Sequence, residues 1–151
     1  MNEQIEFGLN KASKAQLAEH LRVCDADFVP PLSDRVKIER YAAKLEQKAT
    51  RFEAWFDNKL IGLVAAYFND QEKQCAFITS VSVLRKWTGK GLALQLMKQC
   101  IRHAKATDME QLNLEVAIDN HPAISLYEKN GFTVSKTDTS FVTMNLDLRE
   151  R

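Results

Sequence analysis

The amino-acid sequence predicts an α/β (α+β) fold in which helices cover the faces of a mixed β-sheet. Three patterns support this prediction. Residues 112–118 and 142–148 alternate apolar and polar side chains, which is the period of a half-buried strand. Residues 93–104 repeat apolar side chains at helical spacing. The nearly continuous apolar run over residues 60–68 has the length of a buried central strand and is too short to cross a bilayer as a helix.

The composition is that of one soluble domain. The chain has 151 residues, of which 45% are hydrophobic and 27% are charged. No linker rich in Pro, Gly or Ser divides it, so we expect a single domain over residues 1–151. Its 21 Lys and Arg side chains nearly balance its 20 Asp and Glu side chains. This balance argues against a nucleic-acid partner and against a basic membrane anchor.

The cysteine spacing points to a reducing compartment. Cys24, Cys75 and Cys100 are odd in number and widely separated, so they predict neither a disulfide framework nor a metal site. Residues 1–13 lack the basic and apolar segments of a secretory signal. We therefore expect a cytoplasmic protein that holds no metal ion.

The first third of the chain predicts one strand and two helices. Residues 5–9 are a strand candidate, and Ser13 with Gln16 has the spacing of a capping box at a helix start. The paired prolines after Val29 end any helix. Ser33 is a candidate cap for a second helix, whose apolar stripe consists of Ile38, Tyr41, Ala42, Leu45 and Ala49.

The remaining residues predict the other strands and two further helices. Turns at Asp57-Asn58 and at residues 69–72 separate three strands, and Asn130-Gly131 suits a left-handed helix cap. The complete order is β-α-α-β-β-β-α-β-α-β-β. The strands cover residues 51–56, 60–68, 75–84, 112–118 and 142–148, and the helices begin after Gly91 and at Pro122.

A glycine-bearing turn between a strand and a helix predicts an anion site. The strand ends at Val81-Ser82-Val83, and the turn reads Thr88-Gly89-Lys90-Gly91-Leu92-Ala93. The first N–H groups of a helix lack internal partners and lie at the positive end of its dipole. Glycines there allow a phosphate to approach the backbone closely. The alternative is an ordinary turn without a ligand, because the spacing matches neither a P-loop nor a dinucleotide fingerprint.

A second motif follows about 30 residues later and completes a resemblance. Leu114-Glu115-Val116 is followed by Asn120, Ala123, Leu126-Tyr127 and Gly131-Phe132. The two stretches together resemble the GNAT superfamily of acyl-CoA-dependent N-acetyltransferases, over roughly residues 51–132. The resemblance implies a mostly antiparallel sheet of six to seven strands flanked by about four helices.

The resemblance also implies acetyl-CoA as the cofactor and assigns roles to particular residues. The turn from Thr88 to Ala93 (Thr88, Gly89, Lys90, Gly91, Leu92 and Ala93) would bind the pyrophosphate. The backbone of Val81, Ser82 and Val83 would pair with the pantetheine arm, and an N–H near Val81 would polarise the thioester. Asn120 would cap the following helix beside that arm. Tyr127 would be the catalytic acid that protonates the departing thiolate; the alternative for Tyr127 is simple packing of its ring.

Two departures from the family pattern affect these expectations. Thr88 stands where the family usually has Arg or Gln, which weakens the side-chain contribution to pyrophosphate binding. Residues 78–82 contain no carboxylate, although many relatives carry on this strand a Glu that serves as the general base. The general base therefore stays open among Glu53, Glu115, Asp70 and His121, or a water held by Thr79, Ser80 or Ser82. His20 and His103 are expected at solvated helix positions.

The resemblance predicts an enzyme that transfers acetyl from acetyl-CoA directly to a primary amine of a small molecule, in a ternary complex. Acceptors in view are an amino sugar, an amino acid or a polyamine. The alternatives are acetylation of a protein N-terminus or lysine, and a CoA-binding regulatory module without turnover. The acceptor wall is expected within residues 28–56, where Arg35 is either a carboxylate or phosphate ligand or a solvated charge. The apolar face of residues 141–148 would also allow a homodimer.

Overall fold

The computed structural model describes residues 4–149, and residues 1–3 and 150–151 of the expected domain lie outside the described residues. The described chain forms one seven-stranded sheet in the order β1-β2-β3-β4-β5-β7-β6. All neighbouring strands are antiparallel except β4 and β5. The predicted fold class and element order are confirmed.

The elements follow the sequence closely. The strands are β1 (Glu6–Leu9), β2 (Thr50–Phe56), β3 (Lys59–Asp70), β4 (Cys75–Val83), β5 (Gln111–Ala117), β6 (Thr133–Thr137) and β7 (Phe141–Asp147). The α-helices are α1 (Lys14–Cys24), α2 (Ile38–Lys48), α3 (Leu92–Ala106) and α4 (His121–Lys129). Three short 3-10 helices, η1 (Asp25–Asp27), η2 (Leu32–Asp34) and η3 (Arg85–Trp87), lie in the connections.

Local signals in the sequence set several of these boundaries. Ser13 and Gln16 form the predicted capping box at the start of α1. Asp57 and Asn58 both adopt positive φ, 51° and 61°, in the two-residue turn between β2 and β3. Gly131, with φ of 94°, ends α4 as predicted.

Two boundary predictions were wrong. Ser33 does not cap α2: its backbone N–H and hydroxyl donate to the Asp25 carboxylate at 2.7 Å each, within the η1–η2 connection, and α2 begins at Ile38. The turn expected at residues 69–72 lies later, because β3 continues to Asp70, which still pairs with Cys75.

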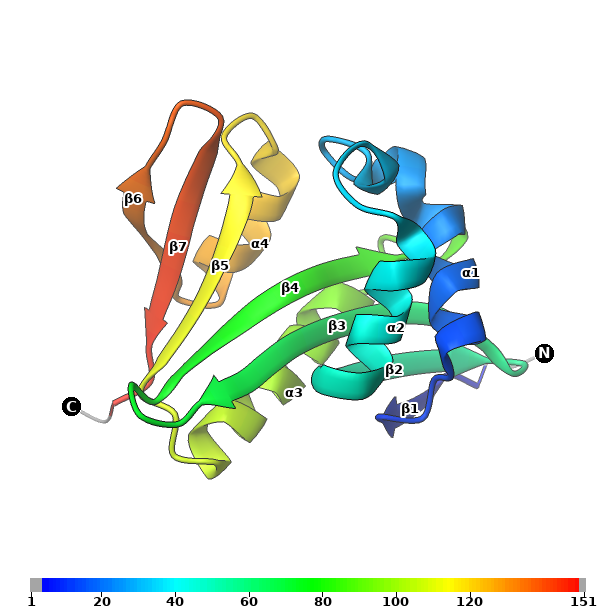
Figure 1. Cartoon of the computed structure of the whole chain (residues 1–151), viewed down its shortest axis with the longest axis horizontal. Helices are drawn as coiled ribbons and strands as arrows, with labels where there is room; N and C mark the ends of the chain where they lie inside the picture. Colours follow the sequence, from blue (N-terminus) through cyan, green and yellow to red (C-terminus); the bar gives the residue numbers. More distant parts are fainter. Residues whose placement is uncertain (1–3, 150–151) are drawn as a thin grey trace.

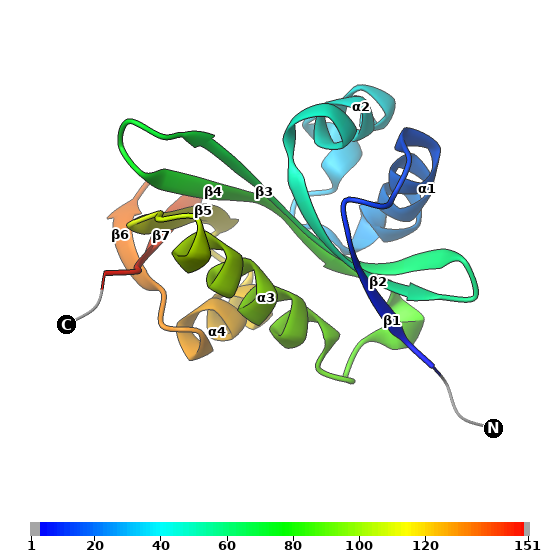
Figure 2. The ribbon, with the colours of Figure 1, turned by 90° about the horizontal axis from the view of Figure 1, so that it is seen from below.

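Helices cover both faces of the sheet and define two apolar layers. α1 and α2 pack on one face, and α3 and α4 pack on the other (Figure 2). The apolar face of β7 belongs to the layer with α3 and α4, since Val142 and Met144 are buried in the same cluster as Leu96 and Phe132. That face is therefore used within the protomer, and a homodimer would need another surface.

The sheet opens between β4 and β5. Only residues 75–78 of β4 pair with β5, and beyond Ile78 the two strands diverge (Figure 1). The divergence begins at a β-bulge, because Ile78 pairs with Ala66 and Ser80 with Ala65, which leaves Thr79 as the extra residue. Residues 79–83 of β4 thus present an edge that β5 does not cover.

No helix among residues 4–149 combines the length and hydropathy that a membrane crossing requires.

Candidate active site

A large cavity lies where β4 diverges from β5, beside the N-terminus of α3. Its volume is about 530 Å³. Predicted cofactor residues make up much of its wall: Val81, Ser82, Val83, Thr88, Gly89, Gly91, Leu92, Ala93 and Asn120. Lys90 is not part of this wall, and its ammonium group lies 5.9 Å from the centroid of the Trp87 ring.

The turn before α3 is an open cradle of backbone groups. Gly89 and Gly91 have φ of 80° and 77°, and a Cβ atom at either position would meet nothing within 4 Å. No side chain caps the start of α3. Its first N–H groups therefore face this space with the helix dipole behind them, which is the arrangement that binds a phosphate. The Thr88 hydroxyl donates to the Arg85 carbonyl at 2.8 Å and so points back into the turn.

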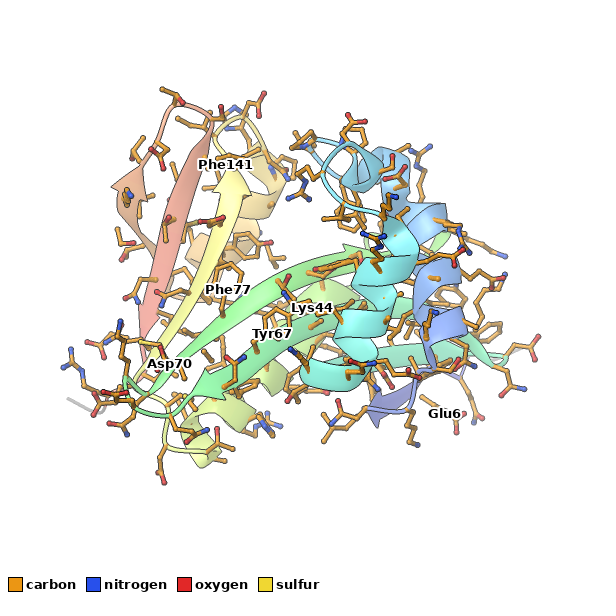
Figure 3. All side chains as sticks on the ribbon, in the orientation of Figure 1. Glu6, Lys44, Tyr67, Asp70, Phe77 and Phe141 are labelled. Atoms are coloured by element: carbon orange, nitrogen blue, oxygen red, sulfur yellow. The ribbon has the colours of Figure 1, made fainter. Side chains whose placement is uncertain are left out.

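A smaller cavity of about 160 Å³ lies on the other side of the opening, below the η1–η2 connection. β4 and β5 supply its floor, and α2 supplies part of its wall. The residues around it include Asp27, Phe28, Val29, Arg35, Tyr41, Thr79, Ser80, Val81, Glu115, Asn120, Ala123, Tyr127 and Phe141. Arg35 and Tyr41, which the sequence places in the acceptor wall, are both present. Figure 3 shows Phe141 at the end of β7 that lies next to this opening.

A side chain of α2 holds the bulge in β4 in place. The Tyr41 hydroxyl donates to the Thr79 carbonyl at 2.9 Å and lies 2.6 Å from the Thr79 hydroxyl. Burial raises the pKa of Tyr41 to about 12, so this phenol keeps its proton. The shape of the opening therefore depends on a side chain from another element.

The two cavities meet at Tyr127. Both are lined by Asp27, Phe28, Val81, Asn120, Ala123 and Tyr127. The Tyr127 side chain is 8% exposed, and burial raises the pKa of its hydroxyl to about 12. Asn120 fixes the start of α4 by accepting a hydrogen bond from the Ala123 N–H at 3.4 Å. The phenol thus keeps its proton and lies at the junction of the two cavities.

The structure separates the candidate bases. Glu53 is buried at the start of α1, where its carboxylate accepts from the backbone N–H groups of Lys11 and Ala12 at 2.9 and 3.0 Å. Asp70 lies at the hairpin end of β3, far from the opening (Figure 3), and His121 is exposed and lines neither cavity. Glu115 lines the smaller cavity. It is the one carboxylate of these candidates that faces the opening.

The three hydroxyls named with these carboxylates line different cavities. Thr79 and Ser80 line the smaller cavity, and Ser82 lines the larger one. Ser80 is 6% exposed, and its Oγ atom has no hydrogen-bond partner within residues 4–149. This hydroxyl is the buried polar group that a ligand or water in the cavity would satisfy.

The expectation of a solvated histidine was wrong for His20, whereas His103 is half-buried. His103 packs edge-on against Phe52 and Phe68. His20 is 2% exposed, with Nδ1 2.8 Å from the Leu60 carbonyl and Nε2 2.8 Å from Ser82 Oγ. A carbonyl only accepts, so Nδ1 carries the proton and Nε2 accepts from the Ser82 hydroxyl. His20 therefore ties α1 to the ends of β3 and β4 beside the larger cavity.

Acidification should destabilise the fold through His20. Burial lowers the pKa of His20 from 6.5 to about 4. The unfolded chain consequently binds more protons between these values, and stability falls as the pH drops from about 6.5 to about 4, by about 3 kcal/mol. Urea unfolding of wild type and His20→Gln across this range measures the effect. The variant should lack this component, and equal losses in both proteins would contradict the assignment.

Comparison with known proteins identifies the family. Residues 15–132 match the model of the acetyltransferase (GNAT) family. Over 124 residues the chain is 26% identical to the L-amino acid N-acetyltransferase AaaT of Escherichia coli, covering 81% of this chain and 75% of that protein. Over 56 residues it is 38% identical to an N-alpha-acetyltransferase of Saccharolobus solfataricus, covering 36% of this chain and 34% of that one.

A solved structure gives the same fold. The N-acetyltransferase PaiA of Thermoplasma acidophilum, in complex with coenzyme A, superposes with a TM-score of 0.73 at 20% identity, covering 95% of this chain and 99% of that chain. The chain spans less than half of the length of the first curated relatives it matches. The family match nevertheless extends from the start of α1 through α4 and includes the turn before α3 and Tyr127. The chain belongs to the acetyltransferase (GNAT) family.

Proposed function

We propose that the protein transfers an acetyl group from acetyl-CoA to the primary amine of a small molecule. The observation that carries this proposal is the junction of the two cavities at Tyr127 and Val81. A thioester in the larger cavity and an amine in the smaller one would meet there. Direct attack needs this contact, because the reacting atoms have to approach within about 3–3.5 Å.

The residues of the larger cavity suit acetyl-CoA. The open backbone cradle at Gly89 and Gly91 would take the pyrophosphate, and the uncovered edge of residues 79–83 would pair with the amides of the pantetheine arm. When bound, this cofactor supplies an activated acetyl thioester. A backbone N–H near Val81 would stabilise the negative charge that develops on the carbonyl oxygen.

Tyr127 would act on the leaving sulfur. Its raised pKa keeps the hydroxyl protonated, so it donates a hydrogen bond to the departing thiolate. Burial disfavours a thiolate as it disfavours a phenolate, which makes the sulfur a stronger base at this position than in water. The proton therefore moves toward the sulfur as the bond to the acyl carbon breaks.

The proposal excludes a covalent relay through cysteine. Cys24 lines the larger cavity, but its side chain is 2% exposed and burial raises the pKa of its thiol to about 11. The reactive form of cysteine is the thiolate, which this position suppresses.

The three free thiols also support a reducing cytoplasm as the location of the protein.

A small acceptor is favoured by the size of the second cavity. Its volume of about 160 Å³ is below the roughly 300–1,000 Å³ of sites for drug-sized ligands. The named relatives leave two acceptor classes in view, since one acts on L-amino acids and the other is an N-alpha-acetyltransferase. Acetylation of a protein N-terminus is therefore the second candidate function.

A thiol-release assay with acetyl-CoA tests the proposal. The panel should contain amino acids, amino sugars, polyamines and short peptides with free N-termini. We expect release with at least one small amine and weaker release with every peptide. Tight acetyl-CoA binding without release on any amine would instead identify a CoA-binding regulatory module.

A further inference from the structure

The smaller cavity carries opposite charges on facing walls. Arg35 lies between η2 and α2, and Glu115 lies on β5 across the opening. The third charged residue at this cavity, Asp27, is paired with Arg85. Within residues 4–149, neither Arg35 nor Glu115 forms an ion pair. The cavity thus offers one cation and one anion to a ligand.

The fold explains why Glu115 faces this cavity. Its neighbours Leu114 and Val116 are buried in the layer with α3 and α4, so the alternation of β5 turns Glu115 toward the other face. That face lies opposite α2. Burial raises the pKa of Tyr41 on this helix, and the charge of Arg35, which lies just before the helix, acts against this rise. Two elements distant in sequence therefore converge on one small space.

The floor between these charges has an unused hydrogen-bonding group. The buried Ser80 Oγ atom lacks a partner in the described chain and faces the same cavity. A volume of about 160 Å³ corresponds to roughly five times the space of one water in the liquid. A compact molecule with a positive and a negative end matches this combination.

We infer that the acceptor is a zwitterionic amino compound of the α-amino acid type. This inference rests on the proposed function. Arg35 binds the carboxylate, for which a guanidinium offers paired donors. The ammonium group lies toward Glu115, which takes one proton from it and leaves a free amine. The Ser80 hydroxyl donates a hydrogen bond to the same carboxylate.

The proton balance of the reaction is complete with these residues. The free amine forms the C–N bond to the acetyl carbon, and the C–S bond breaks. The sulfur takes the proton of the Tyr127 hydroxyl, and the second proton leaving the nitrogen restores that hydroxyl. The proton on Glu115 passes to solvent. The products are the N-acetyl amino acid and the free thiol of the cofactor.

Matched acceptors test the assignment of Arg35. Each amino acid is compared with its carboxamide and with its decarboxylated amine. We expect kcat/KM to be about 10- to 100-fold higher for the free acid, the usual worth of a charged hydrogen bond. Arg35→Gln should remove this preference by raising KM for the acid while leaving the decarboxylated amine unaffected. Arg35→Lys should restore part of it, and Arg40→Gln on α2 is the control outside this cavity.

A pH profile tests Glu115. Glu115→Gln should lower kcat at neutral pH, and the loss should shrink as rising pH deprotonates the amine without help. Glu128→Gln, at an exposed position of α4, is the matched control. A loss of equal size at every pH would assign Glu115 a structural role and remove it from the proposal.

The outcomes separate this inference from the proposed function. If thiol is released equally well with acids, amides and decarboxylated amines, or faster with peptides, the zwitterion is wrong and acetyl transfer stands. If no acceptor releases thiol, the proposed function fails. Calorimetry of the amino acids on the CoA-saturated protein then decides the inference independently. Binding that Arg35→Gln weakens supports it, and absence of binding overturns it.

Discussion

Tyr127→Phe should lower turnover by ~10²–10⁴-fold, the usual contribution of a positioned acid or base. The substitution keeps the ring, which packs 6.0 Å from Phe132 between centroids, and removes the hydroxyl at the junction of the two cavities. That hydroxyl makes no hydrogen bond within residues 4–149 that would be lost with it. Acetyl-CoA affinity and the Tm should therefore change little. Steady-state rates and calorimetric affinity of the same preparation make the comparison.

Tyr67→Phe is the matched control for this experiment. Tyr67 is the tyrosine on β3, beside Lys44 of α2 (Figure 3), and its hydroxyl also lacks a partner in the described part of the chain. It lines neither cavity, so its loss should leave turnover unchanged. A Tyr127→Phe protein that works at full speed would return Tyr127 to a packing role.

Gly91→Val should weaken acetyl-CoA binding by about 100-fold or more. Gly91 has φ of 77°, a conformation that a β-branched residue adopts only with strain. The space around it is open, so the valine side chain would fit and would fill the cradle that we propose for the pyrophosphate. Loss of even one or two charged hydrogen bonds to N–H groups accounts for this magnitude. Calorimetric titration with acetyl-CoA gives the affinity directly.

Backbone strain needs a separate control, and Gly131→Ala provides it. Gly131 also has positive φ, 94°, and a Cβ atom there would lie 3.2 Å from Leu146 Cδ1. It lines neither cavity. This variant should lose stability and keep its affinity for acetyl-CoA. Unchanged affinity in Gly91→Val would show that the cradle does not hold the pyrophosphate.

The parts of the structure that the sequence predicts well are those decided by near neighbours. The capping box at Ser13, the turn at Asp57-Asn58 and the cap at Gly131 each depend on hydrogen bonds or dihedral angles within a few residues. The alternation of residues 111–117 likewise predicts which side chains are buried. These signals locate the elements, and the family motifs then indicate where α3 and α4 meet the opening.

The parts that the sequence leaves undecided depend on distant partners. The alternation of β5 shows that Glu115 points away from the apolar layer, but only the fold places Arg35 and Ser80 opposite it. Glu53 is excluded as a base by backbone donors about forty residues earlier in the chain. The burial of His20 could have been predicted from helical spacing. With Leu17, Leu21 and Cys24 it occupies the apolar stripe of α1, where a solvated residue is not expected.

The bulge at Thr79 determines which side chains of β4 face each side of the sheet. Before the bulge, Ala76 and Ile78 point into the layer with α3 and α4; after it, Val81 and Val83 do so, and Ser82 points to His20 on α1. The extra residue therefore shifts the alternation of β4: even-numbered side chains face the apolar layer before it, and odd-numbered side chains face that layer after it. If β4 kept Thr79 but lost the bulge, strict alternation would drive Ser80 and Ser82 into the apolar layer and turn Val81 and Val83 toward the opposite face; deleting Thr79 would remove the bulge and keep the present faces. A relative that lacks this one residue would therefore keep the faces of β4 and lose the group that Tyr41 holds at the opening.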